Sequence, residues 1–156
     1  MKNYLIAIVL MSLYPLAMEA QEIEVSKVPS TVQAEFQKMF PDAAKTEWEM
    51  DNENFEASFK LNKKCWSAVY DKDGKFVESE VEIKVSELPE PVIQSIEKEF
   101  PGAKIEEPEK TTLSDGNTVY EFELEKDKKE FEVQVSADGK ILNKEESEED
   151  REDEKD

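Results

Sequence analysis

One pattern of proline, aliphatic and aromatic residues occurs twice along this chain of 156 residues. Residues 28–43 are matched by residues 88–103, and both segments carry Val/Leu-Pro at the start and Phe-Pro near the end. Residues 55–75 are matched in the same way by residues 120–140. The second pair of segments lies slightly further apart than the first, which predicts a short insertion in the second copy around residues 111–115. Repetition of both the apolar spacing and the turns predicts one supersecondary unit that is used twice.

Each copy opens with a segment whose apolar residues follow a helical period. In the first copy these residues are Val32, Phe36, Met39 and Phe40, and in the second they are Val92, Ile93, Ile96 and Phe100. Pro41 and Pro101 end the two segments, since proline cannot continue a helix. Pro29 and Pro89 are expected in the first turn, with Ser26 and Ser86 as caps. Helices of about 12 residues are not stable alone, so each must pack on another element.

After each helix the apolar period changes to two, which is typical of strands. The alternating residues of the first copy are Trp48, Met50, Phe55, Ala57, Phe59, Leu61, Trp66, Ala68, Tyr70, Val81 and Ile83. Those of the second are Tyr120, Phe122, Leu124, Phe131, Val133 and Val135. Polar turns such as Asp73-Gly74 and Asp138-Gly139 separate the runs. The chain is therefore predicted to be α+β: a tandem repeat of one helix plus about four antiparallel strands, with the helices packed on one face of a large antiparallel sheet.

The first 20 residues have the composition of a secretory signal peptide. An apolar run from Tyr4 to Leu13 is too short to span a bilayer, and small residues follow it. Cleavage is expected between Ala20 and Gln21, with Ala17 as the alternative site. The expected organisation is a signal peptide at 1–20, a first repeat at 21–86, a second repeat at 87–144 and an acidic disordered tail at 145–156, with the two repeats forming one compact domain. The mature protein would be exported to the periplasm or secreted.

The net charge of −19 at pH 7 limits the partners that the chain can bind. An excess of carboxylates repels phosphate backbones and anionic lipid surfaces, so nucleic acid and membrane partners are disfavoured. The expected partner is another envelope or secreted protein or peptide.

Glutamates fill the strand positions that alternate with the predicted core residues. The expected face is the one turned away from the helices, and there are two readings of it: the solvated side of an antiparallel sheet, or a platform for a basic partner or for cations. The candidate partner-binding residues are Glu121, Glu123, Glu125, Glu130, Glu132, Glu47, Glu49 and Glu56.

The sequence lacks the groups that most enzymes use. It contains no histidine, which removes the commonest general base and the commonest zinc ligand. Its four glycines are not spaced to cradle a phosphate. The single cysteine, Cys65, alternates out of phase with Trp66 and is expected on the face opposite the core. No catalytic residue, metal site or cofactor is therefore predicted.

The paired P-x-x-V-x-x-x-F and F-P-x-A units, the leader and the strand-rich remainder with its Asp-Gly-Lys turn resemble the PepSY-like family of exported bacterial proteins. The resemblance covers residues 25–146 and implies a fold like that of the β-lactamase inhibitor protein. It also implies a non-catalytic binding module, with a protein-inhibitor or peptidase-inhibitor role. The alternative from composition is an acidic protein of the cell envelope that binds or buffers cations such as calcium.

We predict that the exported protein begins at Gln21 and that this glutamine is open to cyclisation. Intact-mass measurement of secreted material checks the cleavage site. Secreted protein that retains residues 1–20 would contradict the export signal.

Overall fold

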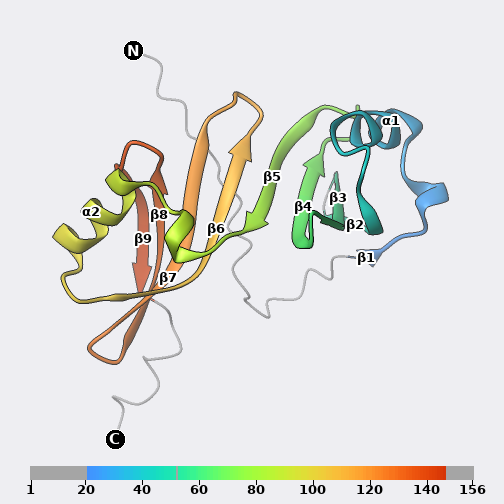
Figure 1. Cartoon of the computed structure of the whole chain (residues 1–156). Coiled ribbons are helices and arrows are strands. Elements are labelled where there is room, and N and C mark those ends of the chain that lie inside the picture. The colour runs from blue at the N-terminus through green and yellow to red at the C-terminus, as the bar shows by residue number, and fades with distance from the viewer. Residues whose placement is uncertain (1–20, 52, 147–156) are drawn as a thin grey trace, which may run out of the picture.

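The computed structural model describes residues 21–51 and 53–146, which form one antiparallel sheet and two α-helices (Figure 1). The strands of the sheet follow one another in chain order, so each strand pairs with the next. They are β1 (Gln21–Glu22), β2 (Ala44–Asp51), β3 (Asn54–Leu61), β4 (Lys64–Tyr70), β5 (Phe76–Glu82), β6 (Lys104–Leu113), β7 (Thr118–Lys126), β8 (Lys129–Ser136) and β9 (Ile141–Glu146). The helices are α1 (Ser30–Met39) and α2 (Glu90–Glu99), preceded by the short 3₁₀ helices η1 (Val25–Lys27) and η2 (Val85–Glu87).

Two predicted segments fall partly or wholly beyond these residues. The signal peptide at 1–20 lies outside the described residues, as does the tail from residue 147 onward. Glu145 and Glu146, which were assigned to the tail, belong instead to β9. Within the described ranges no helix is both long and apolar enough to cross a membrane.

The helices begin later than the sequence predicts. Pro29 and Pro89 have extended ψ angles of 140° and 146°, so they occupy the cap position and not the first turn. Ser26 and Ser86 lie within η1 and η2 and do not cap the α-helices. The proposed serine caps were therefore wrong, because each serine lies inside a 3₁₀ helix that ends before the α-helix begins. Phe40 and Phe100 end the helices, as the following prolines predict.

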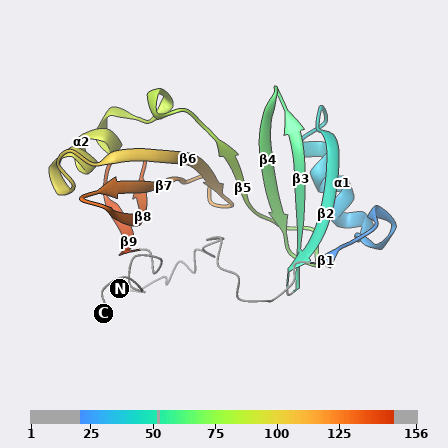
Figure 2. The same ribbon diagram turned by 90° about the horizontal axis from the view of Figure 1, so that it is seen from below.

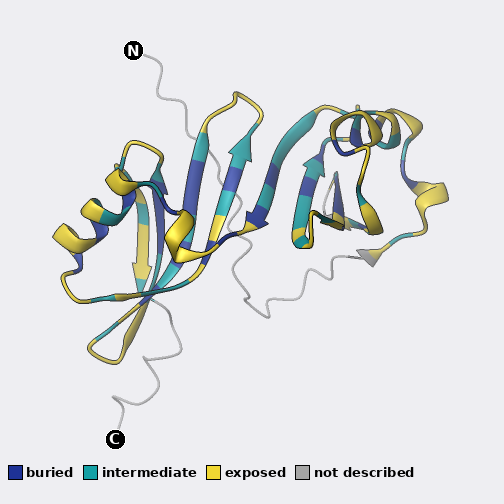
Figure 3. Cartoon of the chain, viewed as in Figure 1, coloured by how far each residue is buried: buried dark blue, intermediate teal, exposed yellow. Residues whose placement is uncertain are grey.

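Each helix packs on the strands of its own repeat (Figure 3). Under α1, Phe36 has edge-on ring contacts with Trp48 at 5.2 Å and with Phe59 at 5.1 Å between centroids. Under α2, Ile96 packs within a separate aliphatic core on β5, β7 and β8. The partly buried Trp66 is packed against both cores. The first core is thus mainly aromatic and the second mainly aliphatic, although the repeat is the same.

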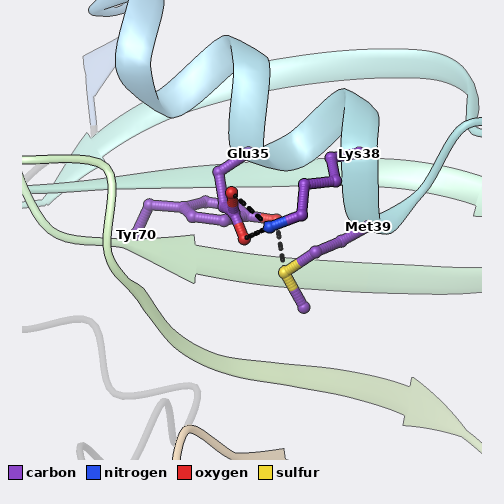
Figure 4. A network of polar contacts seen from close by, with 4 residues as sticks. All are labelled: Glu35, Lys38, Met39 and Tyr70. Atoms are coloured by element: carbon purple, nitrogen blue, oxygen red, sulfur yellow. Dashed lines mark hydrogen bonds and ion pairs between the residues drawn. The ribbon is translucent and has the colours of Figure 1, made fainter.

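A buried tyrosine attaches the end of α1 to the sheet (Figure 4). The Tyr70 side chain is fully buried, and its hydroxyl donates a hydrogen bond to Met39 Sδ at 3.9 Å. Burial, followed by the charge of Glu35, raises the pKa of Tyr70 well above its usual range. Lys38 pairs with Glu35 at 3.0 Å on the exposed side of the helix. Tyr70 therefore stays protonated and acts as a donor inside the first core.

Two equivalent turns lie against the backbone at the helix starts, and both need glycine. Gly74 has φ +86° and Gly139 has φ +88°, values that favour glycine. A Cβ on Gly139 would lie 2.5 Å from the Pro91 carbonyl oxygen, and one on Gly74 would lie 2.9 Å from the backbone of Thr31. These turns are hairpins between β4 and β5 and between β8 and β9, as the sequence predicts.

Strand β5 belongs to both repeats. When residues 55–75 are aligned with 120–140, β5 is the equivalent of β9, since Tyr70 opposite Phe76 matches Val135 opposite Ile141. When the helical segments of the repeats are aligned, the end of β5 is the equivalent of β1, since Glu22 opposite Glu49 matches Glu82 opposite Glu109. The sheet changes direction at this strand: β2, β3 and β4 run at a steep angle to β6 and β7 (Figure 2).

We predict that Phe36→Ala and Ile96→Ala each lower the free energy of unfolding by about 2–5 kcal/mol, because both side chains are buried large residues. Phe36 is 6% exposed and Ile96 is 2% exposed. Urea denaturation measures the change, with Glu97→Ala on the exposed side of α2 as the control. A loss below about 1 kcal/mol at both buried sites would show that these helices do not cover a packed core.

Candidate functional site

The glutamates gather on what we call the polar face, formed by the strand positions that alternate with the core residues. Glu121 lies between the buried Tyr120 and Phe122, and Glu80 precedes the buried Val81. Because successive side chains of a strand point to opposite faces, these carboxylates lie opposite the core. One row of paired positions across the face contains Glu47, Ser58, Ser67, Glu80, Thr111, Val119 and Ser136.

The predicted binding residues form two separate groups on this face. Five of them lie on the neighbouring strands β7 and β8: Glu121, Glu123, Glu125, Glu130 and Glu132. The other three lie on β2 and β3 in the first repeat: Glu47, Glu49 and Glu56. The central strands β4, β5 and β6 stand between the two groups.

Like charges lie directly opposite each other within both groups. Glu123 pairs with Glu132, and Glu125 pairs with Glu130. Glu49 pairs with Glu56. Like charges at directly opposed positions destabilise a sheet. Partial burial, reinforced by neighbouring carboxylates, raises the pKa values of Glu123 and Glu132.

Four glutamates lie at the centre of the polar face, and only Glu121 of them was a predicted binding residue. We call Glu78, Glu80, Glu109 and Glu121 the central acidic cluster. Burial, and then the charges of Glu109, Glu78, Glu121 and Glu56, raises the pKa of Glu80 to about 7. Burial is also the first cause of the raised pKa values of Glu78, Glu109 and Glu121, and other carboxylates add to it for Glu78 and Glu109.

Few groups compensate the charge of the central acidic cluster. The Thr111 hydroxyl donates to Glu80 Oε1 at 3.4 Å, and Gln134 Nε2 donates to Glu121 Oε2 at 2.9 Å. None of the ion pairs found within residues 21–51 and 53–146 includes a member of the cluster. Alternation alone places Glu78 and Glu80 on this face. Their proximity to Glu109 and Glu121 depends on the β5–β6 register, which the sequence does not specify.

An open hollow of about 460 Å³ lies on the polar face and shares Glu80 and Glu109 with the central acidic cluster. Its carboxylates are Glu47, Glu56, Glu80, Glu82 and Glu109, and its cations are Lys45 and Lys60. The exposed Cys65, opposite Lys60 on the neighbouring strand, also lines it, as its predicted phase requires. The charged side chains that line the hollow are therefore mainly carboxylates.

One candidate is corrected by the structure. Glu56 was expected on a solvated surface, but it is 8% exposed. Thr111, Val119 and Gln134 on the same face are also buried, at 3–4% exposure. The middle of the polar face is therefore recessed and not uniformly wet, and Glu56 contributes charge to the hollow more than accessible contact area.

The fold and the site together define a class of protein: a tandem α+β repeat with two small cores and one acidic sheet face. A family model described as "Putative beta-lactamase-inhibitor-like, PepSY-like" matches this chain twice, over residues 16–78 and 67–143. The chain belongs to this PepSY-like family. The two matches overlap at residues 67–78, which include the start of the shared strand β5.

Solved structures share the fold at low sequence identity. A DUF2874 family protein from Bacteroides uniformis is 19% identical, with a TM-score of 0.70 over 76% of this chain and 88% of the other. One of the "putative periplasmic proteins" from Bacteroides eggerthii gives the same values. A BLIP-like protein from Bacteroides fragilis is 16% identical, with a TM-score of 0.66 over 76% of this chain and 85% of the other. No curated protein matches the chain.

The alternative reading, a calcium-binding protein, gains no support from the geometry. Across the described ranges no group of three or more histidine, cysteine, aspartate or glutamate side chains is arranged to hold a metal ion. Carboxylates are numerous on the polar face, but among the described residues their oxygens do not converge on a point where a metal ion could bind.

We predict that stability falls as the pH rises from about 4.5 to about 7. Glu80 has a folded pKa of about 7 against an ordinary value of 4.5, so the folded protein holds more protons in this window. The contribution of Glu80 to stability is therefore fully present below the window and lost above it, by up to about 3 kcal/mol. Glu80→Gln should reduce this dependence by the Glu80 share, and the other glutamates of the face with raised pKa values should retain the rest.

Urea denaturation at pH 4 and pH 8 of the wild type, Glu80→Gln and Glu47→Gln measures the effect. Glu47 is an exposed carboxylate of the same hollow and serves as the control. An unchanged difference between the two pH values in Glu80→Gln would contradict the assignment of the effect to Glu80.

Proposed function

We propose that this chain is an exported, non-catalytic module that binds a basic surface of another envelope or secreted protein through its polar face. The observation that carries the proposal is the excess of carboxylates on that face, above all in the central acidic cluster, which takes part in none of the ion pairs found within residues 21–51 and 53–146. Opposed glutamates and a partly buried carboxylate cluster lower the stability of the free protein. Residues that reduce stability without a structural benefit are characteristic of functional surfaces.

The register supports a single continuous binding face. Phe59 is opposite Trp66, Trp66 is opposite Val81, and through Lys110 this row continues to Tyr120. Members of the row lie in the cores of both helices. We infer that both helices cover the same side, which leaves the polar face open across both repeats.

Lysine and arginine side chains of a partner would supply the missing cations. They would replace carboxylate–carboxylate repulsion by attraction, and the attraction would act before contact by steering the encounter. The same charge disfavours nucleic acid as the partner. The inhibitor-like role, with a peptidase among the target classes, rests on the family description. Location in the periplasm rests on the predicted leader and on the description of the structural relative from Bacteroides eggerthii.

We predict that Glu121, Glu123 and Glu132 changed together to Gln weaken the capture of partner proteins from cell-envelope extract at low salt. The control is the triple change of Glu24, Glu90 and Glu97 to Gln, which removes the same number of charges from exposed sites near or on the helices. Capture should also fall with salt, because the screening length shrinks from about 10 Å at 0.1 M to about 3 Å at 1 M.

The measured quantity is the amount of each retained protein at equal bait concentration. A protein held by the wild type and the control, and lost from the polar-face variant, is a partner of the face. Equal retention by all three proteins would contradict a role for these carboxylates. Thermal unfolding of the variants verifies that all three remain folded.

A further inference from the structure

The outer edge of β9 is equivalent to the outer edge of β5, which already pairs with another strand. Glu80 of β5 is opposite Ser67, and Glu145 of β9 is opposite Glu132, and the two pairs are equivalent in the alignment of the repeats. Both strand pairs also shift register at the same equivalent position. β9 therefore lies against β8 as β5 lies against β4.

The outer edge of β5 accepts a strand, whereas that of β9 has none within the described residues. β6 pairs antiparallel with β5 from Glu78–Leu113 to Glu82–Glu109. β9 is the last strand of the sheet and pairs only with β8 among residues 21–51 and 53–146 (Figure 1). An open edge presents backbone N–H and C=O groups that can pair with another chain.

Two of the features that usually protect an open edge are lacking in β9, although the strand has a register shift against β8 and two glutamates at its end. Prolines and outward-pointing lysines blunt the edges of natural sheets. β9 contains no proline, and its one lysine, Lys144, is held by α2. Lys144 Nζ lies 2.6 Å from Glu99 Oε1 and 5.5 Å from the centroid of the Phe100 ring. The remaining charges of the strand are Glu145 and Glu146.

We propose that the outer edge of β9 accepts an extended basic segment of a partner protein, which joins the sheet as a further antiparallel strand. Glu106, Glu123, Glu132 and Glu145 form one row of paired positions across β6 to β9. A lysine or arginine opposite Glu145 would end this row with an opposite charge, which stabilises paired strands. Backbone pairing supplies affinity in this mode, and alternate side chains supply specificity. The proposal goes beyond binding at the polar face because it uses the backbone edge.

A second copy of this chain fits the edge poorly. In a second copy, the strand equivalent to β6 is β2, but β2 already pairs with β1 at Met50 and Glu49. β2 also ends at Asp51, whereas β6 continues to Leu113 and pairs with β5 along that extension. Two copies would each bring a net charge of −19. A basic partner satisfies both the geometry and the charge.

The probe that tests the edge is a capped ten-residue peptide of alternating lysine and valine. Its control has the same sequence with N-methyl groups on alternate residues, which keeps the charge and removes the backbone donors of one edge. We expect the methylated peptide to bind the mature chain at least about tenfold more weakly, since several backbone hydrogen bonds are lost. We also expect the unmodified peptide to slow amide exchange at residues 141–146.

A pair of charge variants completes the test. Glu145→Lys should weaken binding of the unmodified peptide several-fold more than Glu125→Lys, which makes the same change of charge on β7. Equal binding of the two peptides would overturn the proposal and assign the attraction to the polar face. Protection that appears at residues 44–51 in place of 141–146 would also overturn it.

Discussion

The pairing of β5 with β6 holds the two repeats in one sheet. Each helix has its own core, and Trp66 is packed against both. The ladder between β5 and β6 runs from Glu78–Leu113 to Glu82–Glu109. The pairs at its Leu113 end use residues of the predicted insertion. The insertion lengthens β6 to ten residues, against eight in β2. A sequence difference between the copies therefore provides the connection between them.

The central acidic cluster lies on this same junction. Glu78 and Glu80 come from β5, and Glu109 comes from β6. Their ionisation opposes the pairing that joins the repeats, because burial, and then repulsion from neighbouring carboxylates, raises the pKa of each. Hydrogen bonds and side-chain packing across the ladder must outweigh this repulsion. The junction is thus the place where charge on the polar face and stability of the fold are most directly coupled.

Local patterns predicted much of the fold because each follows from near neighbours in the chain. Helical spacing located Phe36 and Ile96 in the cores, and the Asp-Gly turns located the hairpins. The helix starts were missed because a 3₁₀ turn and an extended proline look like a first helical turn in sequence. Two-residue β1 carries too little pattern to be recognised, and its role becomes visible only through its equivalence to β5.

The candidate site was predicted less well than the fold, for a physical reason. Alternation assigns a glutamate to a face, but its burial and pKa depend on the strands beside it and on the curvature of the sheet. Glu56 and Glu121 illustrate this: both have the predicted phase, yet Glu56 is buried and Glu121 is partly buried and held by Gln134. The register of β5 against β6 has its counterpart in the pairing of β1 with β2, but two residues of β1 carry too little pattern to reveal it in the sequence.

The location of the charge also has a consequence for binding. A partner cation placed in the hollow near Glu80 would favour the ionised carboxylate and offset repulsion across the β5–β6 ladder. Anything that binds the folded state in preference to the unfolded state stabilises it by mass action. Because this repulsion lies at the junction of the repeats, the stabilisation would act on the contact that fixes their relative orientation. The proposed recognition at the polar face would therefore be coupled to the geometry of the two-repeat sheet through the same few carboxylates.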